Sequence, residues 1–298
     1  MGAASSPRPR RSVLFMPGSN ARAMEKARTL PADALILDLE DAVAPGAKAA
    51  ARGQVVAAVR GRGYGRREVI VRVNALGSAW GRDDLAAVAG AGADAVLLPK
   101  VEAPGAVMEV LGILDARGAP ATRAVWCMLE TPRGILNAPA IAAASPRVAA
   151  LVMGTSDLTK DLHARHTRDR LPLLTSLQLC VLAARAAGAA ALDGVHLDLE
   201  DDAGFAAACR QAADLGFDGK TLIHPRTIAT ANEVFAPAPS EVAWARRVIA
   251  AHAEAVAETR GMVVLDGRLI ESLHVDDARR VVALADAIAM ARLPPDES

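Results

Sequence analysis

The strongest constraint on the fold is an eightfold alternation of short apolar runs with longer segments of helical periodicity. Apolar runs of this length, bounded by Gly, Pro or polar residues, are typical of strands buried on both faces. Strands that alternate strictly with helices predict a parallel sheet with helices outside it. The expected strands are Val13–Met16, Ala34–Leu39, Glu68–Val73, Ala95–Leu98, Arg123–Leu129, Ala149–Met153, Gly194–Leu197 and Lys220–Ile223.

The segments between these runs repeat Ala, Leu and Val at helical spacing. Eight strand–helix units within about 235 residues fit the usual size of a (β/α)8 TIM barrel. A doubly wound open sheet is the alternative, but no Gly-x-Gly-x-x-Gly follows the first strand to support a dinucleotide site. We therefore expect an α/β barrel over residues 12–236. The expected helices are Ala21–Leu30, Ala47–Arg60, Asp83–Ala91, Ala103–Ala116, Ile135–Ala144, Leu174–Ala187 and Gly204–Leu215.

Two segments lie outside the expected barrel. Residues 1–11, rich in Arg and Pro, are expected to form a disordered tail. Residues 237–298 follow a Pro-containing hinge and carry two helical patterns, Glu241–Thr259 and Val275–Ala291. Between these helices an apolar run ends in Asp266-Gly, which is also a hairpin-turn signal. Because this extension is short for a core of its own, we expect it to pack on a neighbouring subunit.

Composition excludes several classes of protein. Of 298 residues, 52% are hydrophobic and 23% charged, which is ordinary for a globular chain. The formal net charge of zero gives no electrostatic basis for binding nucleic acid or an anionic membrane. No apolar stretch approaches the roughly 18 residues of a membrane span. Three cysteines without metal-ligand spacing fit a reducing cytoplasm.

Polar residues gather where the expected strands end. The carboxyl ends of the strands form the rim on which barrel enzymes build their active sites. Helix capping alone does not explain polar residues at all eight ends. These residues include Asn20, Asp38, Glu40, Asp41, Arg72, Asn74, Lys100, Glu102, Glu130, Asp157, His196, Asp198, Glu200, Asp201 and His224.

Two of these carboxylates, Glu130 and Asp157, lie just beyond two successive strands. Hard oxygen donors without a neighbouring His or Cys suit Mg²⁺, which takes one or two carboxylates and fills its other positions with water and substrate oxygens. The structural alternative is that both residues cap helices, since acidic residues are common at helix starts. From the residues alone both interpretations stay open.

Only five of the 34 basic residues are lysines, so each is a candidate for a specific role. Lys100 follows the fourth expected strand and Lys220 begins the last one, which makes these two the strongest candidates; chance placement is the alternative. The remaining three are Lys26, Lys48 and Lys160.

Other polar residues carry weaker signals. His163 and His166 have the i, i+3 spacing of metal ligands, but their segment is typical of a solvated loop, so we do not expect zinc there. His196 and His224 are more typical of hydrogen-bonding rim residues than of catalytic bases. The acidic run that begins at Asp198 is either a further part of the site or a set of exposed loop charges.

Seven blocks, taken as an ordered set from about residue 11 to residue 290, resemble the HpcH/HpaI aldolase and citrate lyase beta-subunit family. The closer match is the branch with malyl-CoA, citramalyl-CoA and citryl-CoA lyases, whose fold is a (β/α)8 barrel and whose members are usually trimers or hexamers. The blocks are Arg11-Ser-Val-Leu-Phe-Met-Pro-Gly-Ser-Asn20, Leu37-Asp-Leu-Glu-Asp-Ala-Val43, Val71-Arg-Val-Asn74, Leu98-Pro-Lys-Val-Glu102, Glu130-Thr-Pro132, Gly154-Thr-Ser-Asp157 and Gly219-Lys-Thr-Leu-Ile-His-Pro225.

The resemblance implies roles for the residues that match the family's motifs. Glu130 and Asp157 match the ligands of Mg²⁺, with Mn²⁺ as a possible substitute. Arg72 matches the arginine that holds the substrate carboxylate and neutralises the developing enolate. Backbone N–H groups around Gly154 and Thr155 would add donors to the small 2-oxo acid.

Five further residues receive roles in the same way. Asp38, Glu40 and Asp41 look like the residues that orient metal-bound water and Arg72, although a purely structural role is an equal alternative. Lys100 is expected to tie the acidic rim together. Asp266 resembles the aspartate of a lid that reaches a neighbouring subunit's site and handles the proton of the α-carbon.

The resemblance implies an Mg²⁺-dependent lyase that cleaves a β-hydroxyacyl-CoA into an acyl-CoA and a 2-oxo acid, so that coenzyme A is part of the substrate. A malyl-CoA thioesterase of the same branch is the first alternative. A citrate lyase beta subunit that needs partner subunits is the second. A class II aldolase acting on free 2-oxo acids is also compatible, but it would not need a lid over coenzyme A.

Overall fold

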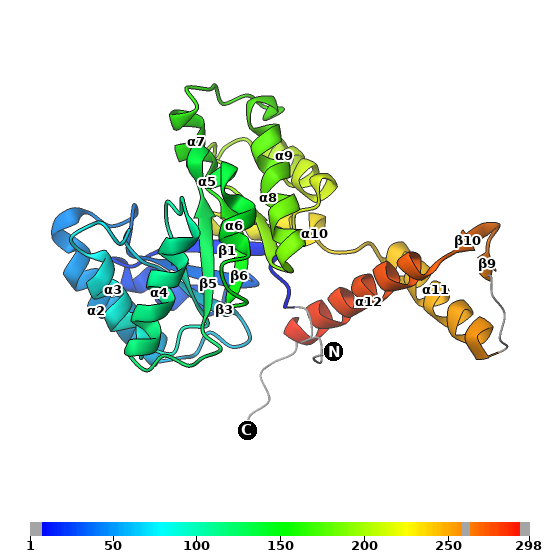
Figure 1. Cartoon of the computed structure of the whole chain (residues 1–298), viewed down its shortest axis with the longest axis horizontal. Coiled ribbons are helices and arrows are strands. Elements are labelled where there is room, and N and C mark those ends of the chain that lie inside the picture. The colour runs from blue at the N-terminus through cyan, green and yellow to red at the C-terminus, as the bar shows by residue number, and fades with distance from the viewer. Residues whose placement is uncertain (1–7, 258–262, 293–298) are drawn as a thin grey trace. The chain divides into compact units, whose positions relative to one another are not determined.

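The computed structural model describes residues 8–257 and 263–292 of the chain (Figure 1). It divides into two compact units, of which the first is Arg10–Phe235 and the second contains the chain from Ala236 onwards. Within the described residues, no helix is both long enough and apolar enough to cross a membrane.

The first unit is a closed barrel of eight parallel strands in which each strand pairs with the next and β8 pairs with β1. The prediction of a (β/α)8 barrel is therefore confirmed. The strands are β1 (Ser12–Pro17), β2 (Ala34–Asp38), β3 (Glu68–Arg72), β4 (Ala95–Leu98), β5 (Ala124–Leu129), β6 (Val148–Met153), β7 (Ala190–Asp193) and β8 (Gly219–Leu222).

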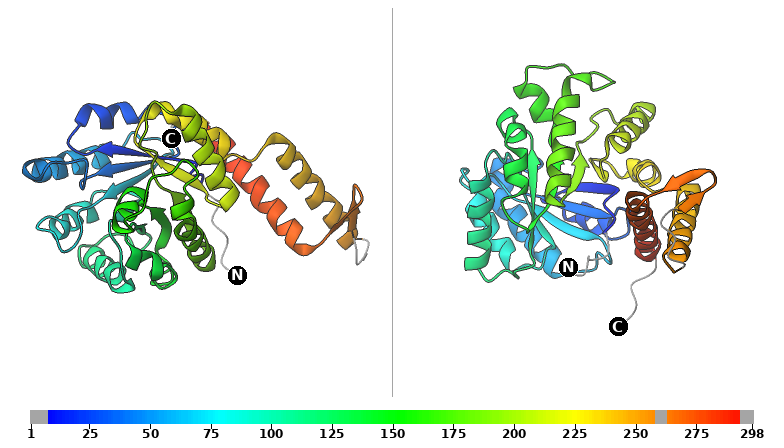
Figure 2. Two further views of the ribbon diagram at one scale, coloured as in Figure 1. Left: turned by 90° about the horizontal axis from the view of Figure 1, so that it is seen from above. Right: turned by 45° about the vertical axis from the view of Figure 1, so that its right-hand side comes forward.

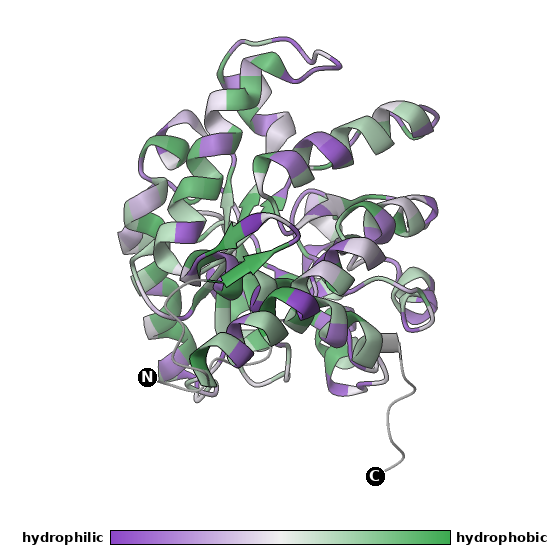
Figure 3. Cartoon of the chain, turned by 90° about the vertical axis from the view of Figure 1, so that its right-hand side faces the viewer, coloured by the Kyte–Doolittle hydropathy of each residue, from purple (hydrophilic) through white to green (hydrophobic). Residues whose placement is uncertain are grey.

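Helices connect successive strands and surround the barrel, as the left view of Figure 2 shows. Most of them mix hydrophobic and hydrophilic residues, the pattern of helices with one buried face (Figure 3). They are α1 (Ala21–Ala27), α2 (Lys48–Arg60), α3 (Gly81–Ala89), α4 (Pro104–Ala116), α5 (Pro132–Leu136), α6 (Ala138–Ala142), α7 (Thr155–Asp161), α8 (Leu174–Ala187), α9 (Asp202–Leu215) and α10 (Ile228–Val234), with short 3-10 turns η1 (Pro45–Ala47), η2 (Leu171–Leu173) and η3 (Pro225–Thr227).

Strand residues alternate between two cores, because successive side chains point to opposite faces of a strand. Ile36, Ile70 and Trp126 are fully buried in the cluster inside the barrel. Leu35 and Leu37 are fully buried in the larger cluster that the strands share with the outer helices. Burial on both faces explains why the strands appear in the sequence as continuous apolar runs.

The predicted position of the seventh strand is wrong. The strand is Ala190–Asp193, and the expected segment Gly194–Leu197 is the irregular chain that follows it. The chain before it is an alanine-rich run, and alanine is depleted in strands, so residue types gave no signal there. Gly188, with φ of 70°, ends α8, and β7 begins two residues later, at Ala190.

Two further differences concern helices on the same side of the barrel. The single helix expected over Ile135–Ala144 is two short helices, α5 and α6, which meet at Asn137. Pro139 stands in the first turn of α6, where its missing N–H costs nothing. The seven-residue helix α7 was not predicted.

The barrel already includes the last residues of the expected disordered tail. Arg10 donates to both carboxylate oxygens of Glu68, at 2.7 and 2.8 Å, and Arg11 donates to both oxygens of Asp33, at 2.8 Å each. The guanidinium of Arg10 also lies 5.0 Å from the ring centroid of Trp126. Residues 1–7 lie outside the described residues.

The second unit consists of α11 (Pro239–Ala257), an antiparallel hairpin of β9 (Val263–Leu265) and β10 (Arg268–Ile270), and α12 (Ser272–Arg292). Contrary to the expectation of no core, Ala245, Val248 and Ile270 are buried in a small cluster of its own. That this unit packs on a neighbouring subunit stays a prediction.

Candidate active site at the barrel rim

The first element of the candidate site is a buried ion pair between adjacent strands. Asp38 and Arg72 are the last residues of β2 and β3 and lie opposite each other in the strand register. The Nε and Nη2 atoms of Arg72 donate to the two oxygens of Asp38, both at 2.6 Å. Asp38 also accepts the backbone N–H groups of Glu40 and Ala42. The guanidinium is therefore fixed in one plane.

The remaining edge of Arg72 faces the rim. Its Nη1 lies 3.0 Å from Oε2 of Glu40 and 3.8 Å from Asp41, and it donates to the sulfur of Met128 at 3.7 Å. The ring of Phe15 covers the guanidinium, with its centroid 4.7 Å away. Burial acts to lower the pKa of Arg72, but its bonds and charges with Asp38, Glu40 and Asp41 raise the pKa more, so it is a permanent cation.

Glu130 directly follows β5 and is 3% exposed. Its Oε1 accepts the backbone N–H of Lys100 at 2.7 Å. Burial raises the pKa of Glu130 to about 7, against the opposing charge of Lys100, so a nearby cation is needed to hold it ionised well below neutrality. Gly154, at the end of β6, must be glycine because a Cβ there would lie 2.3 Å from the Cβ of Glu130.

Asp157 lies in the first turn of α7, two residues after the buried Thr155. Its side chain is 35% exposed, and its Oδ2 lies 3.4 Å from Nζ of Lys100. No side-chain cap hydrogen bond is made at the start of α7, so Asp157 does not serve as the cap that the structural alternative requires. Glu130 is likewise not a cap, because Thr131 caps α5.

Lys100 connects the parts of this rim. Its Nζ donates to Oε1 of Glu40 at 2.8 Å, and its backbone N–H holds Glu130. Burial acts to lower the pKa of Lys100, and the bond to Glu40 with the surrounding carboxylates raises it more. The pKa of Glu40 is raised by burial despite Arg72 and Lys100. The expectation that Lys100 ties the acidic rim together agrees with these contacts.

The residues present fit a hard divalent cation. No group of three or more His, Cys, Asp and Glu in the described residues could enclose a metal. Glu130 and Asp157 offer two carboxylates linked through Lys100, and a buried carboxyl group such as Glu130 is stabilised in its ionised form by a cation. This donor set matches a site that takes its other ligands from water and substrate, as Mg²⁺ sites do.

Sequence reasoning missed the role of Lys48. It is buried, and its Nζ donates to the carbonyl oxygens of Leu39 and Glu40 and to Oδ1 of Asn74, at 2.7 to 2.9 Å. Asn74 in turn donates to Leu39 O and to Asp84. Lys48 thereby holds the turn that carries Glu40. The rarity of lysine was the available signal, but its partner carbonyl groups could not be identified from residue types.

The polar residues in and after β7 and β8 make contacts with one another or with nearby elements. Lys220, a candidate for a specific role, is buried and donates to Asp193 at 2.6 Å, and Asp193 also accepts from Arg170. His224 caps η3 through the N–H of Arg226. The ring of His196 contacts Phe205 edge-on.

The acidic run after β7 pairs with arginines and caps a helix, contacts that loop charges would make. Asp201 caps α9 and accepts from the exposed Arg168, Glu200 pairs with Arg226, and Asp198 accepts the N–H of Glu200.

Asp266 lies in the second unit, in the turn between β9 and β10. Asp266 and Gly267 have φ values of 49° and 75°, as an Asp-Gly hairpin turn requires. Arg247 of α11 donates to both carboxylate oxygens of Asp266, at 2.7 and 2.9 Å, and these bonds lower the pKa of Asp266. The prediction of a hairpin turn at Asp266 is confirmed. The catalytic role of Asp266 stays a prediction.

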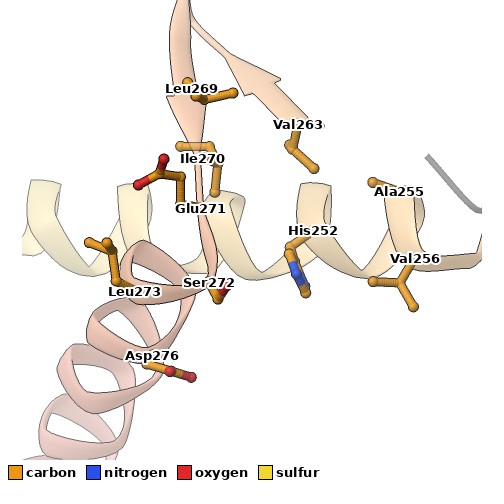
Figure 4. A pocket seen from close by; sticks show the side chains of 10 residues that line it. All are labelled: His252, Ala255, Val256, Val263, Leu269, Ile270, Glu271, Ser272, Leu273 and Asp276. Carbon is orange, nitrogen blue, oxygen red and sulfur yellow. The ribbon is translucent and has the colours of Figure 1, made fainter. Parts of the chain in front are cut away.

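The second unit also contains a pocket of about 720 Å³ between α11, the hairpin and the start of α12 (Figure 4). Asp266 is not among the described residues that line it. Six of its ten lining residues are apolar and four are polar, and none of the residues assigned a role at the barrel rim is among them. The lining residues are His252, Ala255, Val256, Val263, Leu269, Ile270, Glu271, Ser272, Leu273 and Asp276.

Curated relatives match nearly the whole chain. A (3S)-malyl-CoA thioesterase of Cereibacter sphaeroides (strain ATCC 17025 / ATH 2.4.3) is 49% identical over 281 residues, which cover 94% of this chain and 96% of the relative. The citrate lyase subunit beta of Escherichia coli (strain K12) is 40% identical over 284 residues and covers 94% of both chains.

Solved structures of citrate lyase beta-type proteins are also similar to this chain. The protein CitE from Mycobacterium tuberculosis in complex with magnesium, acetoacetate and coenzyme A is 34% identical, with a TM-score of 0.74 over 93% of this chain and 98% of that chain. The citrate lyase beta subunit from M. tuberculosis complexed with oxaloacetate and magnesium has a TM-score of 0.65 at 34% identity, over 77% of this chain and 98% of that chain. The model of the family HpcH/HpaI aldolase/citrate lyase matches residues 11–225, and the chain belongs to this family.

Proposed function

We propose that this chain is an Mg²⁺-dependent enzyme that acts on the coenzyme A thioester of a small β-hydroxy diacid of the malyl-CoA class. The observation that carries the proposal is the arrangement of one rim, where Arg72 is fixed by Asp38 and the carboxylates of Glu130 and Asp157 are both in contact with Lys100. Relatives named for malyl-CoA and citrate chemistry support the same substrate class.

The reaction that we propose first is hydrolysis of the thioester, in which water adds to the thioester carbonyl and coenzyme A leaves as the thiol. Its support is the 49% identity to a (3S)-malyl-CoA thioesterase over nearly the full length of both chains. Three more relatives of that name, from other C. sphaeroides strains, are 47–48% identical. This is the alternative that the sequence left open beside the lyase.

Carbon–carbon cleavage is the second proposed reaction, in which a β-hydroxyacyl-CoA gives a 2-oxo acid and the enolate of an acyl-CoA. It is supported by the citrate lyase beta subunits, which are 37–40% identical. Cleavage needs a group that protonates the enolate carbon. Asp266 is our candidate, which requires that residues 237–298 act as a lid. A partner-dependent citrate lyase subunit remains the third proposal.

Both reactions use the rim in the same way. Arg72 would bind the substrate carboxylate through Nη1, and its charge would stabilise negative charge on the reacting oxygen. The two hydrogen bonds to Asp38 would keep the guanidinium in place during the reaction. The backbone N–H of Thr155 would donate to the same end of the substrate. The N–H of Gly154, the other donor expected from the sequence, already donates to Leu129 O at 3.0 Å. Mg²⁺, when bound at Glu130 and Asp157, supplies Lewis-acid polarisation of substrate oxygens.

The solved relative that holds coenzyme A aligns over 93% of this chain, so most of the second unit has a counterpart in a coenzyme A complex. We propose that the second unit covers coenzyme A at the barrel of a neighbouring subunit in a trimer or hexamer. Exclusion of water by such closure would protect an enolate from protonation by solvent.

The test uses the purified chain, without partner proteins, and a panel of malyl-, β-methylmalyl-, citramalyl- and citryl-CoA with Mg²⁺. Chromatography separates free coenzyme A from acetyl-CoA, and a carbonyl reagent traps the 2-oxo acid. Hydrolysis in H₂¹⁸O should place one ¹⁸O in the released hydroxy acid and produce no acetyl-CoA. Acetyl-CoA with trapped glyoxylate would instead establish cleavage, and no reaction with any thioester would contradict both proposals.

Asp157→Ala supplies the metal control. It removes one of two proposed metal ligands from a partly exposed position, so we expect loss of at least about 1000-fold in activity with an unchanged fold. Excess chelator should abolish wild-type activity in the same way. Full activity in chelator would exclude the metal site.

A further inference from the structure

Lys100 has an unusual position between the two proposed metal ligands. It follows β4 after Pro99 with a φ of 50°, a backbone conformation that a residue with a side chain rarely adopts. In this conformation its backbone N–H reaches Oε1 of Glu130 at 2.7 Å. Its ammonium lies 3.4 Å from Oδ2 of Asp157. One residue thus contacts both carboxylates, and strained backbone of this kind often marks functional sites.

The two contacts of the ammonium differ in strength. Its hydrogen bond to Oε1 of Glu40 is 2.8 Å long, whereas the contact with Asp157 at 3.4 Å is a looser ion pair. The Glu40 side chain is 10% exposed and that of Lys100 is 41% exposed, so the ammonium is held on one side and open on the other. Arg72 is already bound to Asp38, which leaves Lys100 as the cation next to Asp157 among the described ion pairs.

We propose that Lys100 is a built-in competitor for the metal, which holds the carboxylate of Asp157 in place before a divalent cation arrives and lowers the affinity for that cation. The inference rests on the proposed metal site. A cation that binds Asp157 takes an oxygen that the ammonium contacts, and the ammonium then keeps its bond to Glu40. Because the two cations remain neighbours, their repulsion weakens metal binding.

The main variant is Lys100→Met, which keeps the length of the side chain and removes its charge. Titration of Mn²⁺ followed by its EPR signal measures affinity without any assay of activity. Loss of a unit charge next to a divalent ion should tighten Mn²⁺ binding roughly tenfold or more. Lys100→Gln, which can still donate to Glu40, is a second neutral variant and should behave alike. Lys100→Arg keeps the charge and should stay within about threefold of wild type.

Lys160→Met is the matched control for removal of a lysine charge. Lys160 lies on α7, the helix of Asp157, but its side chain is 80% exposed and pairs with Asp161 at 3.8 Å. Its loss should leave Mn²⁺ affinity unchanged. In chelator, Lys100→Met should also melt at a lower temperature than wild type, because Glu40 loses its hydrogen-bonded ammonium.

Unchanged or weaker Mn²⁺ binding by folded Lys100→Met and Lys100→Gln, beside normal binding by wild type, would overturn this inference alone. A failure of wild type to bind Mn²⁺ at millimolar concentration would instead remove the proposed metal site, and this inference with it. Equal tightening in Lys160→Met would show a general charge effect and would also overturn the specific role of Lys100.

Discussion

Two arginine–aspartate pairs with similar geometry lie in the two units and differ in burial. Arg72 binds Asp38 through two hydrogen bonds of 2.6 Å, and Arg247 binds Asp266 through two of 2.7 and 2.9 Å. The side chains of the barrel pair are 8% and 1% exposed, whereas both side chains of the other pair are 54% exposed. A buried charge left without its partner is strongly destabilising, whereas water replaces the partner of an exposed charge.

The difference in burial indicates that the barrel pair is fixed, whereas the exposed pair can separate. Asp38 is also held by the N–H groups of Glu40 and Ala42, so Arg72 is fixed in place, and in the proposed reactions the substrate carboxylate would have to approach it. Asp266 stands in an exposed turn and can exchange Arg247 for another partner at little cost. When it leaves Arg247, the hydrogen bonds that lower its pKa are lost, and it becomes a better proton acceptor.

The largest effect is expected from Arg72→Lys. A lysine cannot make two bonds to Asp38 and present a further donor to the substrate, since its ammonium is a point charge rather than a planar fork. We expect kcat/KM for malyl-CoA to fall on the order of 100- to 1000-fold, with losses in both kcat and KM. Steady-state kinetics checks this. Arg82→Lys, in an exposed ion pair with Glu109, should be unchanged, and unchanged kinetics in Arg72→Lys would make Arg72 structural.

Asp38→Asn should cause the next largest effect, on stability. It removes the bidentate counter-ion of the buried Arg72, which keeps only its contacts with Glu40 and Asp41, and is expected to lower the free energy of unfolding by about 3 kcal/mol. Asp266→Asn removes the same group from the exposed pair and should leave the urea midpoint unchanged. Urea unfolding followed by circular dichroism compares the two. Similar shifts in both variants would show that burial does not separate the pairs.

The sequence predicted the barrel well because its strands are buried on both faces. Such strands appear as apolar runs, and the polar residue after each run falls on the rim by geometry. The rim positions of Glu130, Asp157 and Lys100 were predicted in this way, whereas Arg72 was predicted inside the third strand and is its last residue. Each apolar run is short, so the strict alternation of strands and helices carried more information about the fold than any single run.

The failures have specific physical causes. The strand Ala190–Asp193 contains two alanines and a single large apolar residue, Leu192, and its pairing with β6 and β8 defines it as a strand. The role of Lys48 depends on carbonyl groups of a turn, which residue types do not reveal. The bidentate pair of Asp266 with Arg247 joins residues from α11 and the hairpin, and no local pattern predicts that contact.

The pH dependence of metal binding should show a smaller effect. Burial raises the pKa of Glu130 from 4.5 to about 7, so the folded protein takes up a proton there over this range. Without metal, this group therefore makes the protein less stable as the pH rises from 4.5 to 7. The proton competes with the metal, and Mn²⁺ affinity should fall about tenfold for each pH unit below pH 7.

EPR titrations with Mn²⁺ at several pH values would measure this slope. Asp266, whose pKa is lowered, stays ionised over the same pH range and does not contribute to the pH dependence of Mn²⁺ affinity. An affinity that does not change between about pH 5.5 and 8 would contradict a metal-binding role for a buried Glu130.

The smallest effect, and the sharpest test of the comparison, is expected from mixed oligomers. If the enzyme catalyses the proposed cleavage, Asp266→Asn should keep the fold, the oligomer and Mn²⁺ binding, but lose carbon–carbon cleavage and exchange of the methyl protons of acetyl-CoA. Asp157→Ala should lose the metal and keep an intact Asp266. If the hairpin of one subunit serves the barrel of the next, random mixing in equal amounts pairs an intact barrel with an intact hairpin in about a quarter of the sites.

Such mixing should therefore restore exchange to about a quarter of the wild-type rate, from two inactive parents. Native mass spectrometry must show that the mixed oligomers form. Rescue would mean that the exposed Asp266 leaves Arg247 to complete a site on another chain, whereas the buried Arg72 serves only its own barrel. No rescue in oligomers shown to be mixed would place Asp266 at its own barrel or outside the chemistry. The Arg247–Asp266 pair would then differ from the Arg72–Asp38 pair only in how much it contributes to the stability of the fold.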